Sequence, residues 1–250
     1  MRILVTFAVD AEFAPWRKVR DFVVRDDNFC KVHVTRFGDV EVNILLTGIG
    51  GKSAWVETTK RVWDGDIDVC ISSGLAGALR AEHRPGDILT PQSIWLSASS
   101  KSISCDPALR RWAVQAGARE VEAFYSADTV ILSAGEKQRL GKDADAVEME
   151  SGEVLYEAAA FGARVVAIRG ISDAAEEDLP LDFNRVTTSS GEVSMGRVLG
   201  QVARNLGKVP SLIRFGKQSR AAAEKLCQFL DRYLEGLENA VPEIAKEAAK

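Results

Sequence analysis

Histidine and cysteine are scarce in this chain of 250 residues, which has two histidines and four cysteines. No CxxC pair occurs, and the cysteines are scattered at Cys30, Cys70, Cys105 and Cys227. A zinc site needs clustered sulfur and nitrogen ligands, and a disulfide framework needs a dense set of cysteines. The composition therefore argues against both. We expect neither a metal nor a cofactor, and the cysteine usage fits a reducing, cytoplasmic location.

The chain also lacks an excess of basic residues and a long apolar run. Its formal net charge is −4, so there is no electrostatic reason to expect nucleic acid or an anionic membrane surface as a partner. The apolar run at residues 3–9 is too short to span a bilayer, and it leads into Asp10 and Glu12 without a small-residue cleavage site. We interpret it as a buried first strand, not as a signal peptide.

Strand-like and helical patterns alternate along the chain, without an internal repeat or a low-complexity linker. Strands are predicted at residues 3–9, 31–37, 40–46, 68–73, 88–96, 124–132 and 164–169, with loops at 97–104 and 176–184. Helices are predicted at residues 19–22, 54–63, 107–116, 151–162, 193–206 and 219–237. We expect an α/β fold with a mixed central β-sheet flanked by helices. Residues 1–210 would form a single domain, and residues 211–250 a C-terminal helical extension of it.

Four predicted strands end in segments that carry acidic residues, serine or glycine: Asp10-Ala11-Glu12, Gly48-Ile49-Gly50, Ser73-Gly74-Leu75-Ala76-Gly77 and Ser172-Asp173. Open α/β sheets hold ligands at the carboxyl ends of their strands, so these segments can serve one crevice. Each also has a simpler explanation, because glycine permits tight turns and Ser-Asp is a common helix cap. A complete dinucleotide fingerprint is missing, which disfavours an oxidoreductase.

The segment Glu148-Met149-Glu150 places two carboxylates two residues apart, directly before a predicted helix that starts near Ser151. At a junction between a strand and a helix, one of these carboxylates can point into the same crevice. A solvated charged turn is the alternative interpretation.

Taken in this order, the segments resemble the nucleoside phosphorylase and nucleosidase family, nearest the 5′-methylthioadenosine/S-adenosylhomocysteine nucleosidase branch. The resemblance covers residues 3–206 and depends most on the segments around Glu150, Asp173 and Glu12. It implies a nucleoside phosphorylase-like fold, a homodimer, and cleavage of the N-glycosidic bond of a purine nucleoside of the adenosine type, with or without a 5′ modification, with water favoured over phosphate.

The resemblance also implies roles for individual residues. Asp173, held by Ser172, would protonate or hydrogen-bond N7 of the leaving purine, and Glu12 would deprotonate the attacking water. Glu150 would bind the ribose 2′-hydroxyl and stabilise positive charge. The other expected substrate contacts are Met149 on the sugar, Phe124 on the base, the backbone at Ile49 and Gly77, and Glu148, which is either a ligand or a supporting carboxylate.

The ligand of the attacking water stays open. Leu75 stands where this family usually has a serine that positions the water, and Ser73 is the alternative ligand.

The reaction type also has alternatives. Phosphorolysis, with phosphate as co-substrate, would need cationic ligands, for which Arg17, Arg80 and Arg84 are candidates. Glu12 would repel a phosphate dianion, which favours water. A nucleoside-binding protein without turnover is a third hypothesis, although binding alone does not need three carboxylates.

The helix predicted at residues 54–63 has a broad apolar face, formed by Trp55, Val56, Val62 and Trp63. Such a face is either buried in the core or covered by a second copy of the chain. The second interpretation supports the homodimer that the resemblance implies.

Overall fold

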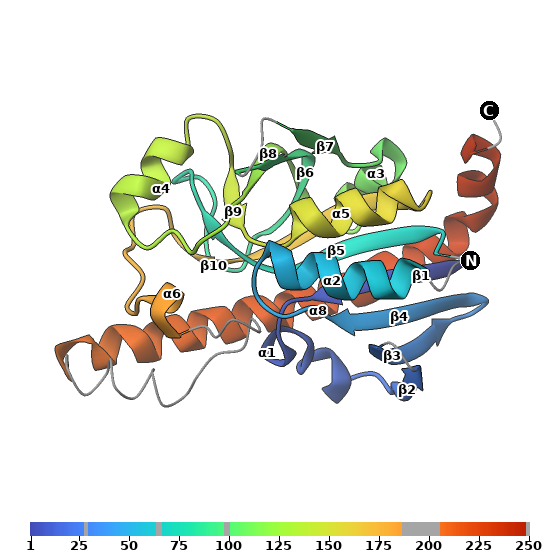
Figure 1. Ribbon diagram of the computed structural model, residues 1–250, viewed down its shortest axis with the longest axis horizontal. Coiled ribbons are helices and arrows are strands. Elements are labelled where there is room, and N and C mark those ends of the chain that lie inside the picture. Colours follow the sequence, from blue (N-terminus) through green and yellow to red (C-terminus); the bar gives the residue numbers. More distant parts are fainter. Residues whose placement is uncertain (28–29, 64–66, 98–100, 187–205, 249–250) are drawn as a thin grey trace.

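Ten strands form the centre of the molecule, and helices cover both faces of the sheet (Figure 1). The computed structural model describes residues 1–27, 30–63, 67–97, 101–186 and 206–248. Within these ranges the strands are β1 (Arg2–Phe7), β2 (Val23–Asp27), β3 (Cys30–Phe37), β4 (Val40–Leu46), β5 (Val69–Ala78), β6 (Ile88–Leu96), β7 (Ser102–Ser104), β8 (Arg119–Ser126), β9 (Ala146–Glu148) and β10 (Arg164–Asp173). The helices are α1 (Asp10–Phe13), α2 (Gly51–Trp63), α3 (Pro107–Gln115), α4 (Ala134–Leu140), α5 (Ser151–Ala160), α6 (Phe183–Val186) and α8 (Val209–Ala248), with 3-10 turns at Trp16–Lys18 and Leu206–Lys208.

Four strands in the middle of the sheet run parallel. β1 pairs with β4 on one side and with β5 on the other, and β5 also pairs with β10. β3 and β2 extend the sheet beyond β4 as antiparallel strands. Beyond β5, the pairings close into a ring that runs from β10 through β6, β8 and β9 back to β5. This mixed sheet with flanking helices confirms the predicted fold class.

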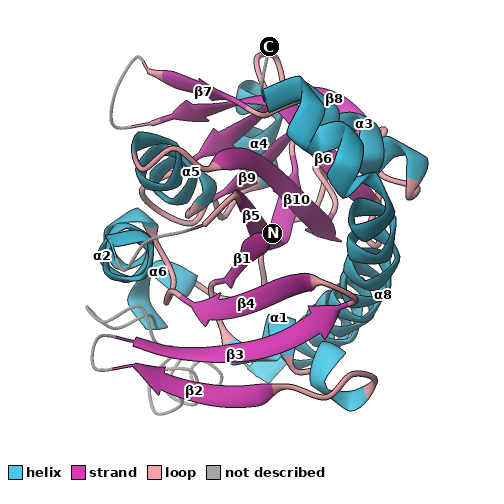
Figure 2. Cartoon of the chain, turned by 90° about the vertical axis from the view of Figure 1, so that its right-hand side faces the viewer, coloured by secondary structure: helices cyan, strands magenta, loops and turns pink. Residues whose placement is uncertain are grey.

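The apolar runs in the sequence explain why these strands lie at the centre. β1, β5 and β10 are buried along nearly their whole length, which requires cover on both faces of the sheet. α2 and α5 pack against each other on one side, and α3 and α8 lie on the other (Figure 2). Since parallel strands point the same way, the segments that follow β1, β4, β5 and β10 gather at one edge of the sheet.

An aromatic cluster holds the segment after β1 against α8. Phe13 and Trp16 are fully buried and contact each other edge to face. The Trp16 indole donates a hydrogen bond to Asp231 of α8 (2.9 Å), and the Cys227 thiol donates one to the backbone carbonyl of Glu12 (3.4 Å). The short helix that carries Glu12 is therefore fixed from the side of α8.

Some predicted elements are wrong. No helix forms at residues 19–22: α1 and the following 3-10 turn come earlier, and Val19 is 70% exposed, so its side chain marks no buried face. The strand predicted at residues 124–132 is β8, which begins at Arg119 and ends at Ser126. The predicted loop at residues 97–104 contains β7, because Ser102–Ser104 pairs with β6. The predicted helix at residues 193–206 lies almost entirely outside the described residues.

The sequence-based prediction also omits β2 and α4, besides the short elements β9 and α6. β2 carries charged residues and lies at the edge of the sheet, where only one neighbouring strand constrains it. α4 is a short, polar helix that begins beside a glycine, Gly135. Neither has the apolar periodicity on which the prediction depends.

α8 covers nearly all of the segment predicted as a C-terminal extension, residues 211–250. It is one continuous helix that packs along β10 and β5, and its inward side chains Leu226, Leu230 and Leu234 are fully buried. Among the described residues, no helix combines the length and the apolar character needed to cross a membrane.

Candidate active site

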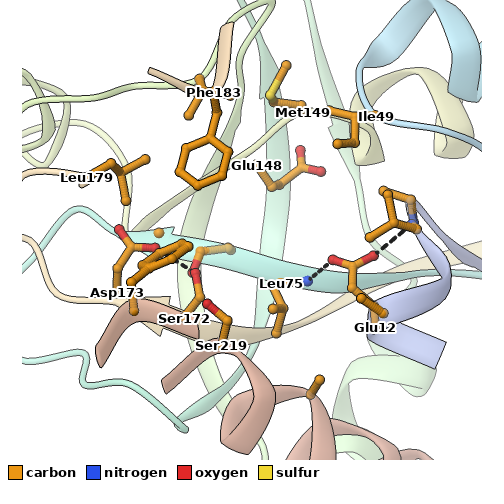
Figure 3. A pocket seen from close by; sticks show the side chains of 18 of the residues that line it. Glu12, Ile49, Leu75, Glu148, Met149, Ser172, Asp173, Leu179, Phe183 and Ser219 are labelled. Carbon is orange, nitrogen blue, oxygen red and sulfur yellow. Dashed lines mark hydrogen bonds between the residues drawn. The ribbon is translucent and has the colours of Figure 1, made fainter. Parts of the chain in front are cut away.

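A cavity of about 620 Å³ lies at the edge where the parallel strands end. Its walls come from the segments after β1 and β4, the end of β5, the turn between β9 and α5, the end of β10, α6 and the first half of α8. Eight of the nine predicted site residues line it: Glu12, Ile49, Gly77, Glu148, Met149, Glu150, Ser172 and Asp173. Figure 3 labels six of them, without Gly77 and Glu150. The fold thus brings together segments that are distant in the sequence.

Phe124 is the ninth predicted site residue, and its proposed place against the base is corrected by the structure. Its side chain is fully buried in the main core and does not line the cavity. Successive side chains of a strand point to opposite faces, and Phe124 lies on the core face of β8. The aromatic residues of the cavity wall are Phe183 of α6 and Phe215 of α8, whose ring centroids lie 5.6 Å apart.

Glu12 lies at one side of the cavity with its carboxylate held by backbone amides (Figure 3). Oε2 accepts hydrogen bonds from the amides of Ala8 (3.0 Å) and Val9 (3.2 Å), and Oε1 accepts one from Leu75 (2.8 Å). Burial raises the pKa of Glu12, although the Arg169 charge and these amides oppose the shift. A carboxylate has about four acceptor positions, so Oε1 keeps one for a further donor such as water.

The turn between β9 and α5 holds two buried carboxylates with different partners. Glu148 Oε2 accepts hydrogen bonds from the amides of Glu150 (2.9 Å) and Ser151 (2.7 Å), and so caps the start of α5. Glu150 Oε1 accepts one from the amide of Gly50 (2.9 Å). Burial raises the pKa of Glu150 to about 7, with Glu148 adding to the shift and Arg169 opposing it. Glu148 thereby positions the turn that presents Glu150.

Arg169 of β10 lies beneath these carboxylates and is fully buried. Its Nη2 donates to Glu148 Oε2 (2.5 Å) and to the Ser151 hydroxyl (3.0 Å), and it lies 3.5 Å from Glu150 Oε2. Its Nη1 donates to the carbonyl of Ser73 (2.9 Å). A buried guanidinium with this many acceptors offsets the cost of burying the acidic groups around it.

Asp173 ends β10 at the other side of the cavity (Figure 3). The Ser172 hydroxyl lies 2.5 Å from Asp173 Oδ1 and 3.2 Å from the carbonyl of Ala76. Gly77 leaves room for this carboxylate, because a Cβ at position 77 would lie 3.0 Å from Asp173 Oδ2.

Lys137 of α4 reaches the same carboxylate from below the cavity wall. Its ammonium forms an ion pair with Asp173 Oδ2 and donates to the carbonyls of Ala174 (3.0 Å) and Glu177 (2.8 Å). The lysine is fully buried and still borders the cavity.

Comparison with known proteins agrees with this geometry. Residues 2–235 match the Phosphorylase superfamily. The chain belongs to this superfamily. The family prediction made from the sequence is therefore confirmed, and the matched region includes every predicted site residue.

Two relatives within the superfamily are 5′-methylthioadenosine/S-adenosylhomocysteine nucleosidases. The protein of Buchnera aphidicola subsp. Schizaphis graminum is 30% identical over 96 residues, which is 37% of this chain but only 40% of that relative. The protein of Glaesserella parasuis serovar 5 is 23% identical over 196 residues, 69% of this chain and 85% of that relative. A similar solved structure is a mutant of futalosine hydrolase from Helicobacter pylori strain 26695, with a TM-score of 0.71 and 18% identity over 94% of this chain and 99% of that one.

Leu75 departs from the serine expected for the nucleosidase branch of the superfamily. Its backbone amide binds Glu12 and its side chain borders the cavity, so it offers no hydroxyl to a water molecule there. Ser73, the alternative water ligand, is buried and does not line the cavity. Neither Leu75 nor Ser73 therefore supplies a side-chain hydroxyl to the cavity.

The three arginines considered as phosphate ligands do not line the cavity. Arg17 pairs with Asp10, and Arg80 pairs with Asp145. Arg84 lies in the turn before β6. The cationic residues that do border the cavity are Lys18, Lys137 and Arg220.

The sequence analysis did not identify two buried cations at this site, Arg169 and Lys137. Arg169 interrupts an otherwise apolar strand, and a charged residue inside a buried strand is a signal that could have found it. Lys137 gives no such signal, because it stands among Glu136, Gln138 and Arg139 in a polar helix. Only its contacts with Asp173, Ala174 and Glu177 show that it is buried.

Proposed function

We propose that this protein cleaves the N-glycosidic bond of a purine nucleoside of the adenosine type and transfers the sugar to water. The observation that carries the proposal is the arrangement of Glu12, Glu150 and Asp173 around one cavity. Breaking this bond builds positive charge on the ribose and negative charge on the base. Carboxylates near the sugar and a proton donor near the base stabilise these two charges.

At the sugar, Glu150 would accept a hydrogen bond from the 2′-hydroxyl. Its Oε1 already accepts the Gly50 amide, and its Oε2 lies 3.5 Å from Arg169, so acceptor positions stay available on the carboxylate. Ile49 and Met149 line the cavity and offer apolar contact to the sugar ring. The turn that carries Glu150 is held by Glu148.

At the nucleophile, Glu12 would orient a water molecule and take its proton. The backbone amides of Ala8, Val9 and Leu75 fix the carboxylate without using all of its acceptor positions. Because burial raises the pKa of Glu12, it is a stronger base than an exposed glutamate, which favours proton transfer from water.

At the base, Asp173 would interact with N7 of the purine as the bond breaks. Ser172 supports it, and Gly77 gives it space. Protonation of N7 lets the base leave as a neutral molecule, which lowers the barrier.

Phosphorolysis is the competing reaction. Lys18 and Arg220 border the cavity, but Arg220 also pairs with Glu224 (3.0 Å). A phosphate dianion placed to attack the sugar would meet the Glu12 carboxylate, and two negative charges at that distance repel each other. Water is the better nucleophile for this site. A binding protein without turnover would have no need for three buried carboxylates, whose burial is costly.

We further propose that the substrate carries a 5′ substituent. Two named relatives act, by their names, on 5′-methylthioadenosine and S-adenosylhomocysteine, and the apolar wall of Leu179, Phe183 and Phe215 suits such a group. The reaction as proposed needs no cofactor.

We also propose a cytoplasmic homodimer, in which the half-exposed Trp55 of α2, next to α5, lies in the interface.

The test is release of free adenine, measured by chromatography. The purified protein is incubated with 5′-methylthioadenosine and with S-adenosylhomocysteine, with and without phosphate, beside a Glu12→Gln control. We expect equal release without phosphate and a loss of about 100-fold or more in kcat for the variant. Release that requires phosphate would establish phosphorolysis instead. Binding without release from either compound would favour the non-catalytic alternative.

A further inference from the structure

Lys137 is a fully buried ammonium with three acceptors at the wall of the cavity. Burying such a charge costs several kcal/mol unless it is paired and hydrogen-bonded. Two of its bonds go to the carbonyls of Ala174 and Glu177, and the third goes to the Asp173 carboxylate. The site therefore maintains a positive charge directly beside the residue proposed to act on the leaving base.

This ion pair conflicts with a simple acid role for Asp173. A neighbouring ammonium favours the ionised form of a carboxyl group. An ionised carboxylate has no proton to give to N7. An isolated aspartic acid also loses its proton near pH 4, far below neutrality. The proton that reaches the base must therefore have another source.

Ser172 lets Asp173 exist both with and without a proton. Its hydroxyl has one hydrogen, yet its oxygen lies within hydrogen-bond distance of both Asp173 Oδ1 and the carbonyl of Ala76. When Asp173 is ionised, the hydroxyl donates to Oδ1. When Asp173 is protonated on Oδ2, the oxygen that faces Lys137, Oδ1 becomes a weaker acceptor and the hydroxyl can donate to the carbonyl of Ala76 instead. A proton can therefore arrive at Asp173 without leaving a buried group unpaired.

We propose that Lys137 stores the proton that Asp173 passes to the leaving purine. This inference depends on the proposed function. As the bond between C1′ and N9 breaks, its electron pair moves into the purine, Asp173 takes a proton from the Lys137 ammonium at Oδ2, and the protonated carboxyl group passes a proton to N7. Lys137 is left neutral. Water adds to C1′ and gives a proton to Glu12, and exchange with solvent returns a proton to Lys137.

The charged groups around the pair are engaged elsewhere in the described part of the chain. The Glu177 carboxylate lies 3.5 Å from Arg214, and Asp178 accepts a hydrogen bond from the first amide of α4 (2.8 Å). Across the cavity, Glu148 is held by Arg169. Lys137 acts through Asp173, as a positioning residue with a transferable proton.

The pH dependence of a Lys137→Met variant tests the proposal. The ratio of its kcat/KM to that of the intact protein is measured with 5′-methylthioadenosine from pH 6 to pH 8. Without Lys137 the proton must come from the carboxyl group itself, so we expect the ratio to be about 100-fold below one at pH 7 and to fall about tenfold for each unit of rising pH. A loss that does not change with pH would overturn the proposal, since a structural role has no such dependence.

A Lys137→Arg variant separates charge from proton transfer. Arginine keeps the positive charge but does not release its proton in this pH range. We expect it to stay impaired, and restored activity would show that charge alone is needed. Lys142→Met, at an exposed lysine two residues after α4, is the matched control for expression and folding.

A substrate with a good leaving group distinguishes failure of this inference from failure of the proposed function. In 4-nitrophenyl β-D-ribofuranoside the phenolate leaves without protonation. For this compound we expect the Lys137→Met ratio to stay constant with pH, and a ratio that falls with pH here too would contradict the inference. If the intact protein releases neither adenine nor nitrophenolate, the proposed function itself fails. Should Lys137→Met not fold, Lys137→Gln is measured in the same way.

Discussion

At each end of the cavity a buried cation compensates the charge of buried carboxylates, but the two cations differ. At the end proposed to hold the sugar (the sugar end), Glu148 and Glu150 lie against Arg169. At the end proposed to hold the base (the base end), Asp173 lies against Lys137. A guanidinium keeps its proton at any ordinary pH, whereas a buried ammonium can give its proton up. The sugar end thus has a fixed positive charge, and the base end has one that can move. This difference matches the proposed chemistry, in which the base needs a proton and the sugar does not.

Removing the fixed charge should have the largest effect. Arg169→Met leaves Glu148 buried without a counter-ion, and breaking a buried ion pair in this way costs about 3 to 5 kcal/mol. We expect the melting temperature to fall by about 10 °C, measured by thermal unfolding. The matched control is Arg164→Met on the same strand, because its ion pair with Asp106 is partly exposed and should matter less. An unchanged melting temperature in Arg169→Met would show that Glu148 and Glu150 do not need Arg169 as a counter-ion.

Titration of Glu150 should have an intermediate effect that is confined to the sugar end. Its pKa is raised to about 7 by burial, and only the ionised form can accept the ribose hydroxyl without competition from its own proton. We expect kcat/KM of the intact protein to fall about tenfold for each pH unit below 7. Glu150→Gln should be less active, and its kcat/KM should not fall in this way below pH 7. If kcat/KM of the variant falls with decreasing pH at the same midpoint, the titrating group is not Glu150.

The same shift gives a prediction for stability with a defined sign. The pKa of Glu150 is above its ordinary value of 4.5 in the folded protein, so the folded state holds a proton there that the unfolded state releases. Stability from this group is complete below about pH 4.5 and is lost as pH rises through about 7. The melting temperature of Glu150→Gln relative to the intact protein should therefore increase between pH 5 and pH 8.

The smallest effect should come from crowding the base end. In Gly77→Ala the added Cβ would lie 3.0 Å from Asp173 Oδ2 and 3.4 Å from Val147, so the carboxylate must move by a few tenths of an ångström. We expect kcat/KM for 5′-methylthioadenosine to fall severalfold with little change in stability, since misplacement of a catalytic group reduces the rate. Gly135→Ala on α4 is the control, because nothing lies within 4 Å of its Cβ. Equal activity in both variants would mean that the position of Asp173 is not critical.

The accuracy of the sequence-based prediction depended on the kind of signal. Buried strands and the helices at residues 54–63 and 107–116 were predicted correctly, because apolar periodicity records burial directly. Residues 19–22 were mistaken for a helix, since an exposed Val19 resembles a buried one in the sequence. Phe124 was placed at the site because it is aromatic, whereas the alternation of β8 turns it into the core. Phe183 and Phe215 meet at the cavity from helices that follow different segments, which no spacing records.

The sequence by itself determined the strand cores and the short motifs at their ends, because these depend on neighbouring residues. It placed Glu12, Glu150 and Asp173 at the ends of elements that a parallel sheet directs to one edge. Only the tertiary structure decided which cations accompany them. Arg169 of β10 pairs with Glu148 and Glu150, and Lys137 of α4 pairs with Asp173. Burial and partners set the charge of an ionisable group, and both arise from contacts between residues that are distant in the chain.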